Sequence, residues 1–122
     1  MNSLGRHWIV EYKECDPANL KDPLIIESFL QEAATVMGAT IVQSNFHHFS
    51  PLGVSGVVII MESHLTIHTW PEFGYAAVDI FTCGKMDTQL AVDFLFEKLK
   101  AKYKITQLLH RGINIGARVE PH

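Results

Sequence analysis

The sequence predicts an α+β fold in which an antiparallel β-sheet has two helices on one face, forming a two-layer sandwich. Three observations support it. Two segments have apolar residues at helical spacing, several others have the alternating or continuous apolar patterns of strands, and short turns join the strands. The predicted order is strand, helix, four strands, helix and strand, which is typical of a sheet covered on one side.

The chain opens with a strand over residues 6–14 and a helix over residues 23–37. Large apolar residues at every second position of the strand place those side chains on one face of a sheet. We expect Asp22 to be the N-cap of the helix, Pro23 its first residue and Gly38 the residue after its end. The apolar residues of these patterns are Trp8, Val10 and Tyr12 in the strand, and Ile25, Ile26, Phe29, Leu30, Ala33, Ala34 and Met37 in the helix.

Four strands and then a second helix follow. The strands are predicted over residues 40–49, 55–62, 65–70 and 75–83, with turns at 50–53, 63–64 and 71–74. An amphipathic helix over residues 88–102 and a last strand over residues 105–110 complete the chain. The residues expected on the inner face of this helix are Leu90, Val92, Phe94, Leu95 and Leu99.

The second face of the predicted sheet has no helix to cover it. Val57, Ile59, Ala77 and Val78 are apolar and are expected on this bare face. Contiguous exposed apolar residues are typical of interaction surfaces. We therefore expect a homodimer in which the sheet of a second copy covers this face.

Composition limits the class of protein. The 122 residues are enough for one domain, spanning residues 1–122, with a single core. The formal net charge of −3 argues against a nucleic-acid partner, because there is no basic excess to neutralise phosphates. The longest apolar run, residues 57–61, is too short to cross a membrane. Residues 1–6 lack the apolar core of a secretory signal, so we expect a cytoplasmic protein with Cys15 and Cys83 reduced.

The most distinctive segment, residues 62–72, contains two histidines that do not predict a metal site. His64 and His68 lie in a strand-like pattern, where four residues span roughly 13 Å. That separation is too large for both imidazoles to reach one zinc ion. His47 and His48 are adjacent on a predicted strand and point to opposite faces. We therefore expect no metal.

Ser63 and Cys83 are candidate reactive residues whose roles the residues alone leave open. No Gly-x-Ser-x-Gly elbow surrounds Ser63, which argues against an α/β-hydrolase. A pairing of Ser63 with His68 would activate the hydroxyl for attack on an acyl carbon. A serine at a tight turn more often bonds the backbone, and an isolated cysteine such as Cys83 is more often a small buried residue.

Three longer motifs carry a resemblance to a known family. Residues 53–60 read GVSGVVII, residues 62–72 read ESHLTIHTWPE, and residues 79–84 read DIFTCG. Together they closely resemble the short prokaryotic form of S-adenosylmethionine decarboxylase, a pyruvoyl-dependent enzyme made as a proenzyme. The similarity extends from the amino terminus to about residue 102.

The resemblance implies self-cleavage between Glu62 and Ser63, giving a β chain of residues 1–62 and an α chain of residues 63–122. Ser63 would become the pyruvoyl group, with no metal and no pyridoxal phosphate. His68 would be the acid/base group of processing and Ser55 the hydroxyl that helps hold the ester intermediate. Because only a short strand segment separates His68 from the turn, we expect His68 to fold back over residue 63. The expected assembly is a homodimer of processed αβ units.

The resemblance also implies how the mature enzyme works. S-adenosylmethionine would form a Schiff base with the pyruvoyl group, lose carbon dioxide and be protonated by Cys83, yielding the aminopropyl donor of spermidine synthesis. Phe49 would stack on the adenine and Glu72 would bind the ribose hydroxyls, with Trp70 beside this pocket.

Two alternatives remain open at this level. Pyruvoyl-dependent arginine and ornithine decarboxylases of the same superfamily keep the processing motif. A catalytically silent homologue would instead bind a small molecule, although the presence of Ser55, Glu62, Ser63, His68 and Cys83 argues for an enzyme.

Overall fold

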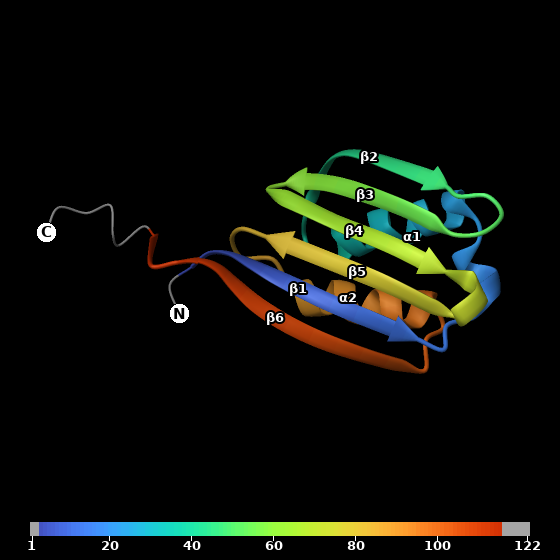
Figure 1. The fold of residues 1–122 in the computed structure, drawn as a ribbon. Coiled ribbons are helices and arrows are strands. Elements are labelled where there is room, and N and C mark those ends of the chain that lie inside the picture. The colour runs from blue at the N-terminus through green and yellow to red at the C-terminus, as the bar shows by residue number, and fades with distance from the viewer. Residues whose placement is uncertain (1–2, 116–122) are drawn as a thin grey trace, which may run out of the picture.

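The computed structural model describes residues 3–115 and confirms the predicted α+β fold (Figure 1). Its strands form one antiparallel sheet in the order β2-β3-β4-β5-β1-β6. Two short 3₁₀ helices were not predicted: η1 (Pro17–Leu20) and η2 (Pro71–Phe73). The other elements are β1 (Ser3–Lys13), α1 (Pro23–Val36), β2 (Thr40–His48), β3 (Val54–Met61), β4 (Ser63–Trp70), β5 (Tyr75–Thr82), α2 (Thr88–Lys98) and β6 (Tyr103–Ile113).

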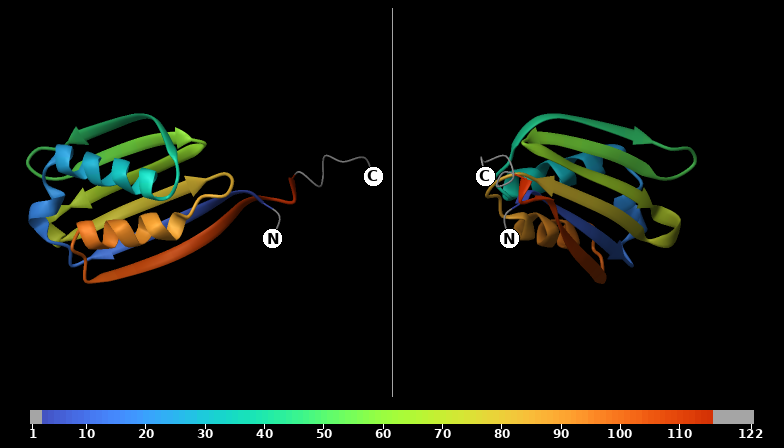
Figure 2. Two further views of the ribbon diagram at one scale, coloured as in Figure 1. Left: turned by 180° about the vertical axis from the view of Figure 1, so that it is seen from behind. Right: turned by 60° about the vertical axis from the view of Figure 1, so that its left-hand side comes forward.

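Both helices lie on the same face of the sheet (Figure 2). The boundaries of α1 follow from its sequence, because the Asp22 side chain accepts a hydrogen bond from the Leu24 amide at 2.9 Å. Gly38, with φ of +92°, follows its end. The predicted α1 cap is therefore confirmed.

Helix α2 is shorter than predicted. It ends at Lys98, and Lys100 has φ of +53°, a left-handed conformation that cannot continue a helix. Its inner face also differs from the prediction. Leu90 was expected to face inward but is 47% exposed, whereas Val92, Leu95 and Leu99 are buried as predicted.

The core lies between the sheet and the helices. Tyr12 is fully buried there, and its hydroxyl donates to the Val92 carbonyl of α2 at 2.7 Å. Burial strongly raises the pKa of this phenol, so Tyr12 joins sheet and helix as a neutral group. The strand residues buried on this helix-covered face include Val10, Val58, Ile60, Leu65, Ile67, Ala76, Val78 and Ile80.

The opposite side of the sheet, which we call the open face, has no helix over it (Figures 1 and 2). Val57, Ile59 and Ala77 are half-buried there, as predicted. The prediction for Val78 was wrong. Val78 pairs with Val10 and is only 1% exposed, because it lies in phase with Ala76 and Ile80 on the helix-covered face.

The reversal between β3 and β4 lies earlier in the chain than predicted, because Ile60 pairs with Ser63. Ser63 and His64 were expected in the turn, but both belong to β4, and Glu62 alone separates the two strands. Both Cys15, which is buried, and Cys83, which is half-buried, are free thiols. Within residues 3–115, no helix is both long and apolar enough to span a membrane.

Candidate functional site

The predicted cleavage bond lies at the tip of the β3–β4 hairpin. Ser63 pairs with Ile60 of β3 and with Thr82 of β5, so its backbone is held on both sides. Its φ of +113° is in a region that side-chain-bearing residues rarely adopt. Such a conformation costs of order 1–3 kcal/mol and persists only when the surrounding structure enforces it. The sheet therefore holds Ser63 in a strained backbone conformation next to the Glu62 carbonyl.

Cys83 lies beside Ser63. It directly follows β5, and its Sγ atom is 3.3 Å from the Ser63 Oγ atom. These two residues are 20 positions apart in the sequence and meet because β4 and β5 pair side by side. We call Glu62, Ser63 and Cys83 the cleavage group.

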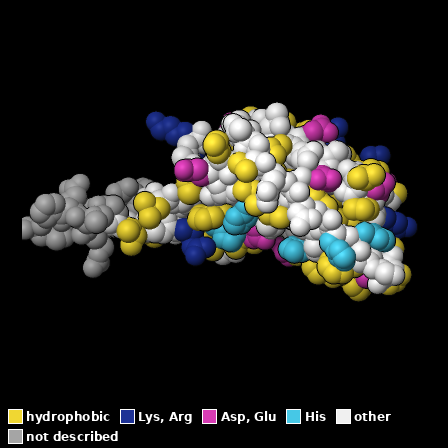
Figure 3. Space-filling model, turned by 90° about the horizontal axis from the view of Figure 1, so that it is seen from above, with side chains coloured by type: hydrophobic (Ala, Val, Ile, Leu, Met, Phe, Trp, Pro, Cys, Tyr) yellow, Lys and Arg dark blue, Asp and Glu magenta, His cyan; other side chains and the backbone are white. Residues whose placement is uncertain are grey.

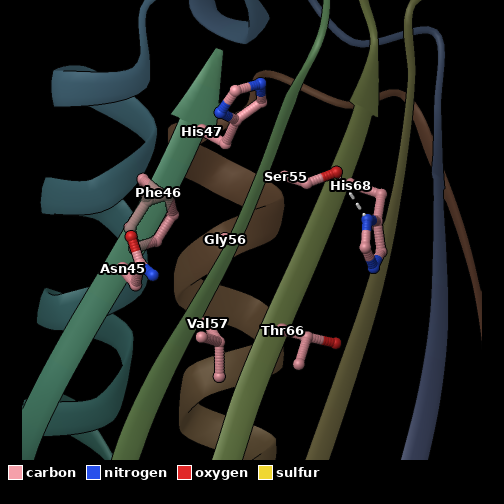
Figure 4. A pocket seen from close by; sticks show the side chains of 8 residues that line it. All are labelled: Asn45, Phe46, His47, Ser55, Gly56, Val57, Thr66 and His68. Carbon is pink, nitrogen blue, oxygen red and sulfur yellow. Dashed lines mark hydrogen bonds between the residues drawn. The ribbon is translucent and has the colours of Figure 1, made fainter. Parts of the chain in front are cut away.

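Ser55 and His68 form a second pair. They face each other across β3 and β4, and the Ser55 Oγ atom lies 2.7 Å from His68 Nδ1 (Figure 4). Which of the two atoms donates depends on the imidazole tautomer. The hydrogen bond orients the ring, while His68 itself is exposed on the open face.

Three further predicted residues surround the same pair. Phe49, Trp70 and Glu72 line a pocket of about 350 Å³ together with Ser55 and His68. Phe49 is 48% exposed and Trp70 is 40% exposed, so both present aromatic surface to this pocket. We call these five residues the recognition group.

An adjoining pocket of about 310 Å³ extends from Ser55 and His68 along the open face (Figure 4). Asn45 and His47 of β2 contribute polar groups to it, and sequence reasoning did not assign either a role. Their spacing on β2 was a usable signal, because residues two apart on a regular strand share one face.

Thr69 was also missed. Its buried hydroxyl donates to the Leu20 carbonyl and accepts from the Val54 amide, both at 2.9 Å. It thereby fixes the backbone beside both members of the Ser55–His68 pair. No sequence signal distinguished this threonine from an ordinary strand residue.

The recognition group and the cleavage group lie at opposite ends of β4. Ser63 is the first residue of the strand, and the five residues to His68 span roughly 16 Å of extended chain. His68 therefore does not fold back over residue 63 of its own chain, and that expectation was wrong. The pairing of Ser55 with His68 and of Ile60 with Ser63 fixes this separation within the sheet.

A polar network on the open face lies between the two groups. Asp79 of β5 is 2.9 Å from His7 Nε2 and accepts a hydrogen bond from Thr66. Nearby, the Tyr75 hydroxyl donates to Glu11; burial, and then this bond, raise the pKa of Tyr75 to about 12. Histidine side chains gather along one side of the molecule (Figure 3). Across residues 3–115, no three His, Cys, Asp or Glu side chains are grouped as metal ligands would be.

Comparisons with known proteins agree on one family. Residues 6–112 match the family model described as S-adenosylmethionine decarboxylase. The chain is 51% identical over 114 residues to the S-adenosylmethionine decarboxylase proenzyme of Pyrococcus furiosus, covering 93% of this chain and 82% of the relative. It is 57% identical over 103 residues to the Thermotoga petrophila proenzyme, covering 84% of this chain and 79% of the relative.

A solved structure shows the same fold. The adenosylmethionine decarboxylase of Aquifex aeolicus superposes with a TM-score of 0.85 at 34% identity, covering 93% of this chain and 94% of that one. Sequence and fold thus agree over nearly the whole length of the chain. The chain belongs to the S-adenosylmethionine decarboxylase family.

Proposed function

We propose that this chain is a proenzyme that cuts its own Glu62–Ser63 bond and then decarboxylates S-adenosylmethionine for polyamine synthesis. The observation that carries the proposal is the cleavage group. In a member of this family, a strained Ser63 lies at a hairpin tip with the Cys83 thiol 3.3 Å from its hydroxyl.

The residues present fit the chemistry of self-cleavage. The Ser63 Oγ atom attacks the Glu62 carbonyl carbon, and the acyl group moves from the Ser63 nitrogen to that oxygen. The amide is normally the more stable form, so strain at Ser63 favours the ester. Removal of the Ser63 α-proton then expels residues 1–62 as a carboxylate. The dehydroalanine left at residue 63 takes up water and loses ammonia, which leaves a pyruvoyl group.

In the mature enzyme, each side chain has a defined task. A pyruvoyl group supplies an electron sink for the electron pair left when carbon dioxide departs. Cys83, next to residue 63, donates the proton that replaces the carboxylate on the substrate Cα. Phe49 offers a flat surface to the adenine, and Glu72 accepts hydrogen bonds from the ribose hydroxyls. The aromatic rings also attract the substrate sulfonium, by about 0.5–2 kcal/mol.

We further propose that the active site is assembled from two copies of the chain. Processing requires His68 and Ser55 beside residue 63, and one chain keeps them roughly 16 Å apart along β4. In this dimer the open faces of two copies pack against each other and are related by a two-fold axis. The axis lies between the two sheets, perpendicular to β4 and level with Thr66, so the two copies of β4 run in opposite directions. It thereby brings the cleavage group of one copy over the recognition group of the other.

The open face supports this arrangement. Val57, Ile59 and Ala77 are apolar, and no element of residues 3–115 covers them. Removing these apolar side chains from water favours the packing of a second sheet against them. The dimer expected from the sequence thus gains a chemical role in addition to covering an apolar face.

Complementation between two impaired variants tests the shared site. Co-expressed His68→Ala and Cys83→Ala chains form hybrid dimers in which one site has both intact halves and the other has neither. Random pairing makes half of the dimers hybrids, so about one quarter of the wild-type sites are complete. We expect carbon dioxide release at about a quarter of the wild-type level.

The matched control combines two variants of the same group. Co-expressed His68→Ala and Ser55→Ala chains leave every site with a damaged recognition group, so activity stays at the level of the separate variants. Recovery in this control, or none in the first pair, would contradict the shared site.

The substrate is tested directly by carbon dioxide release from carboxyl-labelled S-adenosylmethionine, arginine and ornithine. We expect turnover of S-adenosylmethionine, because an aromatic ring and a carboxylate flank Ser55 and His68 in one pocket. A preference for arginine or ornithine would overturn the substrate assignment.

A further inference from the structure

The segment that follows Cys83 has little packing to hold it in place. Gly84 has φ of +103°, and a Cβ atom built on it would meet no atom within 4 Å. A cavity of about 450 Å³ lies beside this segment, lined by residues 3–6, Thr82, Gly84, Lys85 and His110. Few side chains therefore restrain the backbone next to the catalytic thiol.

Arg6 supplies the missing restraint. Its Nη2 atom donates a hydrogen bond to the Gly84 carbonyl at 3.2 Å. Arg6 pairs with Thr82, the residue before Cys83, so the guanidinium reaches across the end of β5. In the part of the chain that the structure describes, Arg6 has no carboxylate within ion-pair distance.

The neighbouring glycine allows the close approach of β1 to β5. A Cβ atom on Gly5 would lie 2.6 Å from the Phe81 ring and 3.2 Å from the Thr82 carbonyl oxygen. A larger residue at position 5 would push β1 away from the end of β5. Gly5 therefore lets β1 lie close to Thr82, and Arg6 holds Gly84 by a hydrogen bond. Together they restrain the residues on either side of Cys83.

We infer that Arg6 is a positioning residue that fixes the Cys83 thiol so that its proton reaches the substrate Cα. The inference rests on the proposed function, in which Cys83 is the proton donor. Arg6 touches neither substrate nor residue 63 in this account, and it acts only through the Gly84 carbonyl.

The position of the thiol decides between two outcomes. After carbon dioxide leaves, the electron pair is shared between the substrate Cα and the former α-carbon of residue 63. A proton on the substrate Cα gives the product amine after water cleaves the bond to nitrogen. If the proton instead goes to the former α-carbon of residue 63, water cleaves the bond between the nitrogen and the substrate carbon. The substrate then leaves as an aldehyde, and its nitrogen stays on the chain as the amino group of an amino-terminal alanine. This second outcome inactivates the enzyme permanently.

The test measures how often the wrong outcome occurs. We expect Arg6→Gln to raise the ratio of alanine-ended α chains to completed turnovers about three- to tenfold, the range for losing one hydrogen bond. The KM for S-adenosylmethionine should stay unchanged, because the Arg6 guanidinium bonds the Gly84 carbonyl and no residue of the recognition group. Arg6→Lys, which keeps a cationic donor, should restore part of the wild-type ratio. Mass spectrometry of the α chain and product counting give both quantities.

Arg111→Gln is the matched control. Arg111 of the edge strand β6 pairs with Gly5 at the same end of the sheet, but its guanidinium lies over the Phe81 ring at 5.8 Å. This variant should leave the alanine ratio at the wild-type value. An equal rise in Arg6→Gln and Arg111→Gln would mean a general loosening of the sheet end and would overturn the inference.

A second readout does not depend on turnover. In the Ser63→Ala background, the rate of Cys83 alkylation by iodoacetamide reports the freedom of the thiol, with buried Cys15 as an internal reference. We expect Arg6→Gln to increase this rate about three- to tenfold. An unchanged alkylation rate together with an unchanged alanine ratio would overturn the role of Arg6.

Cys83→Ala distinguishes the proton-donor role of Cys83 from the positioning role of Arg6. If it does not raise the alanine ratio, the proton-donor role in the proposed function is wrong. If Cys83→Ala raises the ratio and Arg6→Gln does not, only the inference about Arg6 fails.

Discussion

Single residues of the candidate site are held in place by their backbone and their neighbours. Ser63 is held at φ of +113° by strands on both sides, and the Cys83 thiol lies against its hydroxyl. His68 is oriented by one hydrogen bond to Ser55 across the β3–β4 pair. Each of these arrangements uses a cross-strand neighbour, so the sheet register determines which residues meet.

Cys15 gives a prediction about pH. Burial raises the pKa of this thiol from 9.0 to about 11, so the folded chain keeps a proton that the unfolded chain loses near pH 9. The free energy of unfolding should therefore fall as the pH rises from about 9 to 11. Urea unfolding at several pH values measures this change in the free energy of unfolding.

The control for this prediction is Cys15→Ala, which removes the titrating thiol. Its unfolding free energy should decline less steeply than that of the wild type between pH 9 and 10. Parallel curves for the two proteins would show that Cys15 does not contribute to the decline.

Residue types were easier to predict than residue contacts. The motif from residue 62 to residue 72 identified Ser63, His68 and Glu72 as candidates from their chemistry and their resemblance to a family. Thr69 lies inside the same motif and was not identified, although it makes two buried hydrogen bonds. Its partners, Leu20 and Val54, are distant in sequence, and only the fold brings them to it.

At the scale of elements, the β3–β4 hairpin is the feature that positions the cleavage bond. Because Ile60 pairs with Ser63, Met61 and Glu62 form the reversal, and Ser63 directly after it has φ of +113°. The sequence suggested a turn over residues 63–64, because these residues separate the strand-like runs 55–62 and 65–70. Pairing of Ser63 and His64 with β3 and β5 extends β4 to Ser63 and overrides that local preference.

Helix α1 gives a prediction about caps. Asp22→Ala removes the acceptor for the Leu24 amide, and such a loss costs about 1 kcal/mol of stability. Asp22→Asn keeps an acceptor oxygen and should stay close to the wild type. Urea unfolding of both variants measures the difference, and an equal loss in both would argue against a role for the cap hydrogen bond.

Burial patterns could be predicted where one face of an element dominates. The periodicity of α1 correctly indicated Ile26, Leu30, Ala33 and Ala34 as core residues. On β5, by contrast, consecutive apolar residues gave no clear alternation, and Val78 was assigned to the wrong face. A strand with apolar residues on both faces needs its partners' register before its faces can be assigned.

At the scale of the whole molecule, the sheet separates two groups of residues that act together in the proposed mechanism. The short sequence distance between Ser63 and His68 suggested a contact that an extended strand cannot make. An open face with apolar residues at its centre and half of a site at each end fits association with a second copy. The dimer was expected from apolar residues on an uncovered sheet face and from the family resemblance, whereas its proposed chemical role became visible only from the strand geometry.

Denaturing mass spectrometry of the purified wild-type protein tests the central claim, self-cleavage at Ser63, most directly. The account predicts two chains, residues 1–62 and residues 63–122, the second lighter than a chain that begins with serine. Ser63→Ala, which lacks the attacking hydroxyl, should give one uncut chain of about 13.7 kDa. A wild-type protein found as a single 13.7 kDa chain that still releases carbon dioxide from S-adenosylmethionine would contradict the account.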